Sequence, residues 1–126
     1  MKARNLSHLT KAEDYDSCSN IILDECILGW TCIRTSKDNI AWIKFSDVDF
    51  KNYSYLSIDA LLKSQTNIEI RIDTINGDIV GNLNITSSLN KDNWNNFNCK
   101  LKSINSINDL YLKINGDFLI NSLLLF

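Results

Sequence analysis

A tryptophan lies within a run of asparagine and aspartate residues near the end of the chain, in Asp92–Leu101. Such composition is typical of surface loops, so we expect Trp94 to expose part of its indole ring to water. An exposed indole either binds a partner or covers the core as a lid. The apolar C–H face of a sugar stacks flat on such a ring, and asparagine side chains can bond its hydroxyls. Trp94 is therefore a predicted sugar platform, with rim packing as the alternative.

Other asparagines are candidates for bonding hydroxyl groups of the same ligand. They are Asn93, Asn95, Asn96 and Asn121. Because asparagine is frequent throughout this chain, each of them taken alone is more simply explained as a turn residue or a solvent contact.

Composition restricts the classes of function that are open to this chain. Its 126 residues suffice for one domain with a core and are too few for two. The net charge is −2 and the sequence pI about 5.2. A nucleic-acid groove needs an excess of Lys and Arg on one face, so we expect no nucleic-acid partner. No apolar run is long enough for a secretion signal or a membrane span, and we expect a monomer without a membrane partner.

The four cysteines, Cys18, Cys26, Cys32 and Cys99, show no zinc or redox spacing, and the only histidine is His8. Buried free thiols or one or two disulfides are the expected states, and four cysteines allow three pairings. Catalysis is not expected. A glycosidase needs two carboxylates at a defined separation, and the acids here lie on alternating strands and in turns. No nucleophile elbow is present.

Strand patterns dominate the chain and predict an all-β fold. Ile68–Asp73 alternates apolar and polar residues, Asn76-Gly77-Asp78 predicts a turn, and Ile79–Thr86 predicts the returning strand of a hairpin. Further strands are predicted at Ile21–Leu23, Trp42–Phe45, Tyr55–Leu61, Phe97–Leu101, Leu110–Ile114 and Phe118–Phe126. Short strands separated by turns at this spacing are typical of a β-sandwich.

Some positions within these strands are predicted in more detail. Trp42, Phe45 and Phe97 are expected in the core, and Tyr111 is either an outward residue or a buried one with a bonded hydroxyl. The run Leu123–Phe126 is apolar on both faces, so it predicts a closing strand in the middle of a sheet.

Five segments in order resemble carbohydrate-binding module family 6. They are Ala12–Ser17 followed by Ile21–Asp24, Asp38–Phe45 leading into Asp47–Phe50, Ile68–Asp73 with Gly77 and Val80-Gly81, Asn93–Phe97, and Asn108–Leu112. The resemblance runs from about Ala12 to Phe126. It leaves residues 1–11 as an N-terminal extension or linker and makes 12–126 the binding domain.

The resemblance implies a jelly-roll β-sandwich of two antiparallel sheets that binds a polysaccharide or oligosaccharide without catalysis. The glycan would be xylan, β-glucan or a similar β-glycan, bound in a cleft at the loop end. It also implies an extracellular location and attachment to a glycoside hydrolase. Glu13 matches the family's metal-binding Glu, and Asp24 lies where the next acid is expected. A structural Ca²⁺ held by these residues is therefore expected, and it would join the first strand to the last.

The chain departs from the family pattern at two places. The second sugar-stacking aromatic corresponds to Ser36 without a gap and to Trp30 with an insertion, and Trp30 would then face Trp94 across one sugar. In the closing strand, Ile120 and Ser122 stand at the positions of a binding Asn and a calcium-binding Asp, with Asn121 one residue away. These departures keep open a second hypothesis, an interaction or adhesion module on the same sandwich that has lost its sugar site.

Overall fold

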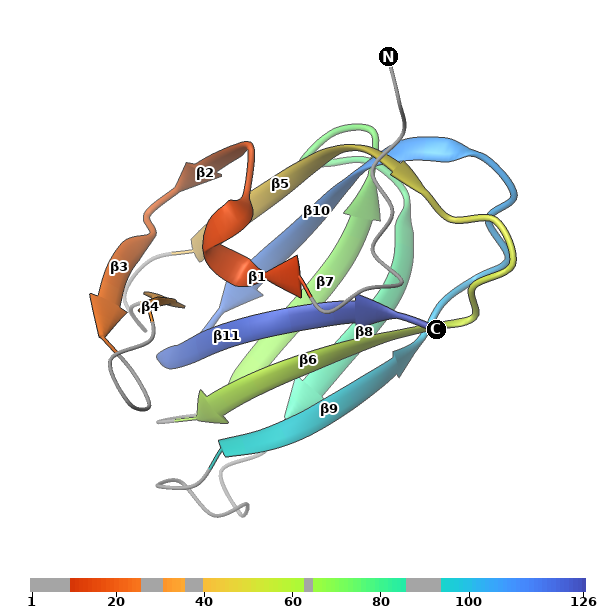
Figure 1. Ribbon diagram of the computed structural model, residues 1–126. Coiled ribbons are helices and arrows are strands. Elements are labelled where there is room, and N and C mark those ends of the chain that lie inside the picture. Colours follow the sequence, from red (N-terminus) through yellow and green to blue (C-terminus); the bar gives the residue numbers. More distant parts are fainter. Residues whose placement is uncertain (1–9, 26–30, 36–39, 63–64, 86–93) are drawn as a thin grey trace.

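Two antiparallel β-sheets packed face to face form the protein (Figure 1). The structure is a computed structural model that describes residues 10–25, 31–35, 40–62, 65–85 and 94–126. Five strands of the six-stranded sheet follow the order β3 (Ile22–Glu25), β4 (Thr31–Arg34), β11 (Phe118–Leu125), β6 (Tyr55–Leu62) and β9 (Trp94–Lys100). The sixth strand, β1 (Thr10–Lys11), pairs with β11. The five-stranded sheet has the order β2 (Ser17–Ser19), β5 (Ile40–Asp49), β10 (Ile107–Asn115), β7 (Thr66–Ile72) and β8 (Ile79–Ile85). The predicted all-β sandwich is confirmed.

The helical content of the described residues is one 3-10 turn, η1 (Ala12–Asp14), which links β1 to β2. None of the helical structure in this part of the chain could cross a membrane. The segment Leu56–Leu62, whose composition is also compatible with a helix, lies in strand β6 and pairs with β11 and β9.

Alternation in the sequence builds the five-stranded sheet. In β7 the buried residues are Thr66, Ile68 and Ile70, and β10 buries Leu110, Leu112 and Ile114 at matching register. Because successive strand residues point to opposite faces, one face of each strand enters the core and the other stays outside. The predicted hairpin of β7 and β8 is confirmed, with Ile68 opposite Leu83.

A β-bulge in β5 reverses which residues face the core. Ala41, Ile43 and Phe45 are buried before it, and Val48 and Phe50 are buried after it. The register shift lies opposite Asn108–Leu110, and Asp47 adopts a positive φ of 54°. The Asp47 N–H donates to Asp109 Oδ1 at 3.0 Å, which holds the extra residue in place.

The closing strand β11 lies in the middle of its sheet, between β4 and β6, as the apolar run Leu123–Phe126 predicted. Leu123 and Leu125 are buried, while Leu124 is half-buried on the other face. Phe126 follows the strand, is 49% exposed, and stacks on Tyr55 with ring centroids 5.4 Å apart. Burial on both faces is therefore complete only in the middle of the strand, over residues 120–123.

The buried Thr35 joins β4 to the turn between β10 and β11. Its hydroxyl donates to the Gly116 carbonyl at 2.7 Å and accepts from the Phe118 N–H at 3.3 Å. Gly116 has a φ of 151°, and a Cβ there would meet Thr66 Oγ1 at less than van der Waals distance. Glycine is therefore required at this turn, and Thr35 satisfies two buried backbone groups.

Three of the four cysteines, Cys18, Cys32 and Cys99, lie in the described residues, and no disulfide joins any two of them. Cys26 lies outside the described part of the chain. Cys99 is 3% exposed, and its burial raises the pKa of the thiol, partly offset by a hydrogen bond from the Asn82 backbone. Since the thiolate is the reactive form, folding suppresses the reactivity of Cys99.

Alkylation by iodoacetamide tests this protection. We expect Cys99 in the native protein to react at least about tenfold more slowly than the half-buried Cys18, because both access and thiolate formation are reduced. Peptide mapping by mass spectrometry over time measures the two rates. In urea the two cysteines should react alike, and equal rates in the native protein would contradict the packing of β9.

Candidate functional site

Trp94 is the first residue of β9 and not a loop residue, so the strand begins three residues before the predicted Phe97. It lies directly opposite Leu61 in β6. Cys99 lies in the core, and Phe97 packs against the core from the same side of the strand. Trp94, Asn96 and Asn98 alternate with them and point to the other side. The half-buried indole therefore lies on the solvent side of the six-stranded sheet. Its strand, β9, is an edge strand of that sheet (Figure 1).

The neighbours of Trp94 on this face are apolar. Leu61 is half-buried and pairs in turn with Leu119 of β11, also half-buried, so the three side chains form a row across β9, β6 and β11. Asn96, two residues along β9, is exposed and accepts a hydrogen bond from the Ser57 hydroxyl at 2.8 Å. Trp94 thus combines an accessible ring with an amide on the same face.

The other predicted sugar-binding residues have different outcomes. Trp30 and Asn93 lie outside the described residues. Asn121 is the bulged residue of β11 and is 7% exposed, and its Oδ1 accepts a hydrogen bond from Lys11 Nζ at 3.3 Å. The row of paired side chains that starts at Trp94 reaches β11 at Leu119. The structure therefore does not bring the Asn121 amide to Trp94.

The two predicted metal ligands do not form a calcium cage in the described residues. Asp24 forms an ion pair with Arg34 at 3.3 Å and accepts a hydrogen bond from the Glu25 N–H at 2.8 Å, and the half-buried Glu13 lies in η1. Within the described ranges, no three acidic, histidine or cysteine side chains gather as metal ligands. Calcium takes six to eight oxygen ligands, backbone carbonyls among them, so two carboxylates alone would not complete its coordination shell, and the expected Ca²⁺ stays a prediction.

Trp42 is not in the core, and that prediction was wrong. It is half-buried on the outer face of the five-stranded sheet, while Ala41 and Ile43 on either side of it are buried. Trp42 and Phe45 are three residues apart and cannot both face inward along a regular strand, so the buried Phe45 leaves Trp42 outside. Tyr111, the outward alternative of the two predicted, contacts Trp42 edge to face with ring centroids 5.6 Å apart.

We call the solvent side of this sheet the outer face. Among its side chains are Trp42, Lys44, Asp47, Asp49, Asn67, Glu69, Arg71, Asn82, Asn84, Asp109, Tyr111 and Lys113. The aromatic pair lies on β5 and β10, and the amides lie on β7 and β8. An aromatic floor with amides at one side is chemistry that suits a sugar.

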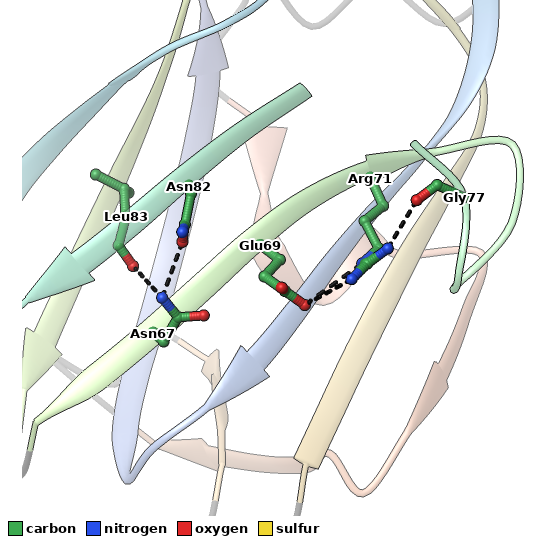
Figure 2. Close-up of polar contacts among 6 residues, drawn as sticks. All are labelled: Asn67, Glu69, Arg71, Gly77, Asn82 and Leu83. Carbon is green, nitrogen blue, oxygen red and sulfur yellow. Dashed lines mark hydrogen bonds and ion pairs between the residues drawn. The ribbon is translucent and has the colours of Figure 1, made fainter. Parts of the chain in front are cut away.

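The amides interact between β7 and β8, and the charges interact within β7 (Figure 2). Asn67 Nδ2 donates to Asn82 Oδ1 at 2.8 Å, and Arg71 Nη2 lies 3.2 Å from Glu69 Oε1. Arg71 Nη1 also donates to the Gly77 carbonyl at 2.7 Å, which fixes the guanidinium near the hairpin turn.

A shallow pocket of about 230 Å³ adjoins the amide end of the outer face. It is lined by Gln65, Thr66, Asn67, Asn84 and Asn115. Four of its five lining residues carry side-chain amides, which both donate and accept hydrogen bonds, so the pocket suits a ligand rich in hydroxyls.

The cation on the aromatic side is held by two neighbours. Lys44 Nζ lies 5.7 Å from the Tyr111 ring centroid and 3.5 Å from Asp109 Oδ2. Tyr111 and then Asp109 raise the pKa of Lys44 above its usual value, so the ammonium stays charged at neutral pH. The sequence also indicated this face. Trp42 and Lys44 are two residues apart, as are Tyr111 and Lys113, so the members of each pair point to the same side of their strand.

Comparison with known protein families gives one match over most of the chain. The family model described as carbohydrate binding module (family 6) matches residues 11–123. No curated protein sequence matches the chain significantly.

Solved structures match the whole sandwich at low identity. A module from Clostridium cellulolyticum in complex with xylose is 22% identical, with a TM-score of 0.86 over 98% of this chain and 99% of that one. A β-1,3-glucan-binding module from Bacillus halodurans is 20% identical, with a TM-score of 0.84 and 98% of both chains covered. An arabinoxylan arabinofuranohydrolase from Bacillus subtilis is 16% identical, with a TM-score of 0.87, and the match covers 99% of this chain but 28% of the enzyme.

Proposed function

The chain belongs to family 6 of the carbohydrate-binding modules, and from this premise we propose that it binds a β-glycan through Trp94. The observation that supports the proposal is the position of this indole on the solvent side of β9. A pyranose stacked on the ring would bury apolar surface on both partners, and Asn96 is near enough along the strand to bond a hydroxyl. The family is non-catalytic, so the module's role is attachment.

A shallow site of this kind binds weakly. We expect dissociation constants from roughly micromolar to millimolar, or about −8 to −4 kcal/mol. Weak binding suffices when the module is tethered to an enzyme, because tethering raises the effective concentration at the polymer. The match to 28% of an arabinofuranohydrolase supports attachment to a glycoside hydrolase as the biological setting.

The outer face is a second candidate location for glycan binding. The edge-to-face pair of Trp42 and Tyr111 favours it, because it places two half-buried rings beside the amides of Asn67 and Asn82. The two locations lie on opposite sheets and are therefore separable by substitution.

Affinity electrophoresis tests the function itself. We expect native gels that contain xylan, β-glucan or mannan to retard the protein relative to a polysaccharide-free gel, with no release of reducing sugar. The interaction-module hypothesis, which Ile120 and Ser122 favour, predicts unchanged mobility in every gel. A sugar array then identifies the glycan. Absence of retardation and of array signals would contradict the proposal.

A further inference from the structure

The edges of the two sheets meet along one side of the sandwich. β8 is an edge strand of the five-stranded sheet, and β9 is an edge strand of the six-stranded sheet. The Lys102 N–H donates to the Val80 carbonyl at 2.8 Å, and the Asn82 backbone bonds the Cys99 thiol. These two bonds tie β8 to the end of β9, so the surface along this junction is set by the fold.

A groove of about 450 Å³ follows the junction, and we call it the seam groove. Its apolar lining consists of Ile79, Val80, Gly81 and Leu101. Val80 and Leu101 are almost completely buried, whereas Ile79 is 36% exposed and accessible to a ligand. Pockets of this size, mainly apolar and with a few polar groups, are typical of sites that bind small molecules.

The charged side chains that line the seam groove are both lysines, Lys100 and Lys102. Neither of them forms an ion pair with another described residue. Asp78 lines an adjoining hollow that Lys102 also lines, and Glu69 of the neighbouring β7 is already paired with Arg71. Asp78 can balance one lysine at most, so the groove keeps a positive charge.

An apolar ligand with one carboxylate would match both parts of the seam groove. Its apolar part would cover Val80 and Leu101, and the burial of apolar surface would drive binding. Its carboxylate would accept a charge-assisted hydrogen bond from an ammonium group, which is stronger than a bond between neutral groups. Lysine stems lie along apolar surface while the ammonium stays in water, so Lys100 and Lys102 can hold the carboxylate at the rim.

We propose that the seam groove binds a small apolar acid, in which an aromatic or aliphatic group carries one carboxylate. The apolar group lies on Val80 and Leu101, and Lys100 and Lys102 bind the carboxylate. This site goes beyond the proposed glycan binding. Lys100 and Trp94 are the two ends of β9, about 20 Å apart along the strand, so the two sites share no residue.

Titration of the isotope-labelled protein with naphthoate, followed by NMR, tests the site directly. We expect the largest amide shifts at residues 79–82 and 100–102, with a dissociation constant of about 1 mM for a ligand of this size. Naphthylmethanol has the same ring system without the charge. It should bind at the same residues about tenfold more weakly, because the charge-assisted hydrogen bond is lost.

Three variants separate the contributions of charge and apolar surface. Lys100→Gln combined with Lys102→Gln should weaken naphthoate binding about tenfold and leave naphthylmethanol binding unchanged. Ile79→Ser should weaken the binding of both ligands, because it removes part of the apolar lining. Lys113→Gln is the matched control and should change neither affinity, since Lys113 also forms no ion pair among the described residues but lies on the outer face.

Equal affinity for the acid and the alcohol, or a preference that survives loss of both lysines, would overturn the inference. Absence of saturable naphthoate shifts, or shifts outside the seam groove, would overturn it as well. Shifts in the groove with polygalacturonate but none with naphthoate would assign the groove to an acidic polysaccharide instead. The double lysine variant should be retarded in glycan gels like the unsubstituted protein, so failure of this inference would leave the proposed function standing.

Discussion

Replacement of Trp94 by alanine is expected to abolish retardation in gels of neutral β-glycans while the domain stays folded. The substitution removes the stacking surface, and losing the burial of one large apolar side chain costs about 1.5–3 kcal/mol. Each 1.4 kcal/mol is about tenfold in affinity, so a site that starts near millimolar drops below detection. Stability should fall by about 1 kcal/mol or less, because the half-buried ring lies outside the buried core.

Two further variants make this result specific. Trp42→Ala removes an indole of similar exposure from the opposite sheet and should leave retardation by neutral glycans unchanged. Trp94→Tyr retains an aromatic face and should keep part of the binding. If Trp42→Ala lost neutral-glycan binding and Trp94→Ala kept it, the site would lie on the outer face. Circular dichroism and thermal unfolding of each variant show whether the fold is intact.

Replacement of Gly81 by alanine is expected to lower the free energy of unfolding by up to about 3 kcal/mol, because the added methyl overpacks the core. A Cβ at Gly81 would lie 2.8 Å from Cys99 Sγ and 3.1 Å from both Ile70 Cδ1 and Leu101 Cδ2. These atoms come from β9, β7 and the residue after β9, where the edges of the two sheets approach each other. Urea unfolding measures the change.

A double-mutant cycle identifies the cause of this loss. Cys99→Ala removes the nearest atom, so Gly81→Ala should cost less in the Cys99→Ala background than in the unsubstituted protein. Asn82→Ala is the neighbouring control and should change stability by about 0.5 kcal/mol or less, because Asn82 is exposed. Equal costs of Gly81→Ala in both backgrounds would show that the contact with Cys99 is not the source of strain.

Strands with regular alternation were located well, and so were β6 and β11, which were predicted at Tyr55–Leu61 and Phe118–Phe126. The predicted Ile68–Asp73 and Leu110–Ile114 correspond to β7 and β10, and the predicted Ile79–Thr86 corresponds to β8. Alternation is a local property, and it appears in the sequence because one face of each strand is buried. Strands β1, β2 and β4 were not predicted, since their two to four residues are too short to show a period.

Asparagine-rich composition concealed the start of β9. Asn and Asp predict turns from local backbone preferences, yet Trp94, Asn95 and Asn96 pair with Leu61, Ala60 and Asp59 of β6. A ladder with an adjacent strand outweighs those preferences, and no local pattern records it. The resemblance to the family covered this segment and still could not tell whether the indole stood in a loop or on a strand.

The chain's own pattern determined an all-β sandwich, the strands that alternate, and an indole near the start of β9 that faces solvent. The tertiary structure decided which parity of β5 faces the core, and so moved Trp42 to the outer face beside Tyr111. It also formed the ion pairs of Asp24 with Arg34 and of Glu69 with Arg71, and the hydrogen bond of Lys11 to Asn121. Lys113 forms no ion pair among the described residues. Alternation depends on neighbours along the chain, whereas facing and ion pairing depend on strands brought together by the fold, many residues apart in sequence.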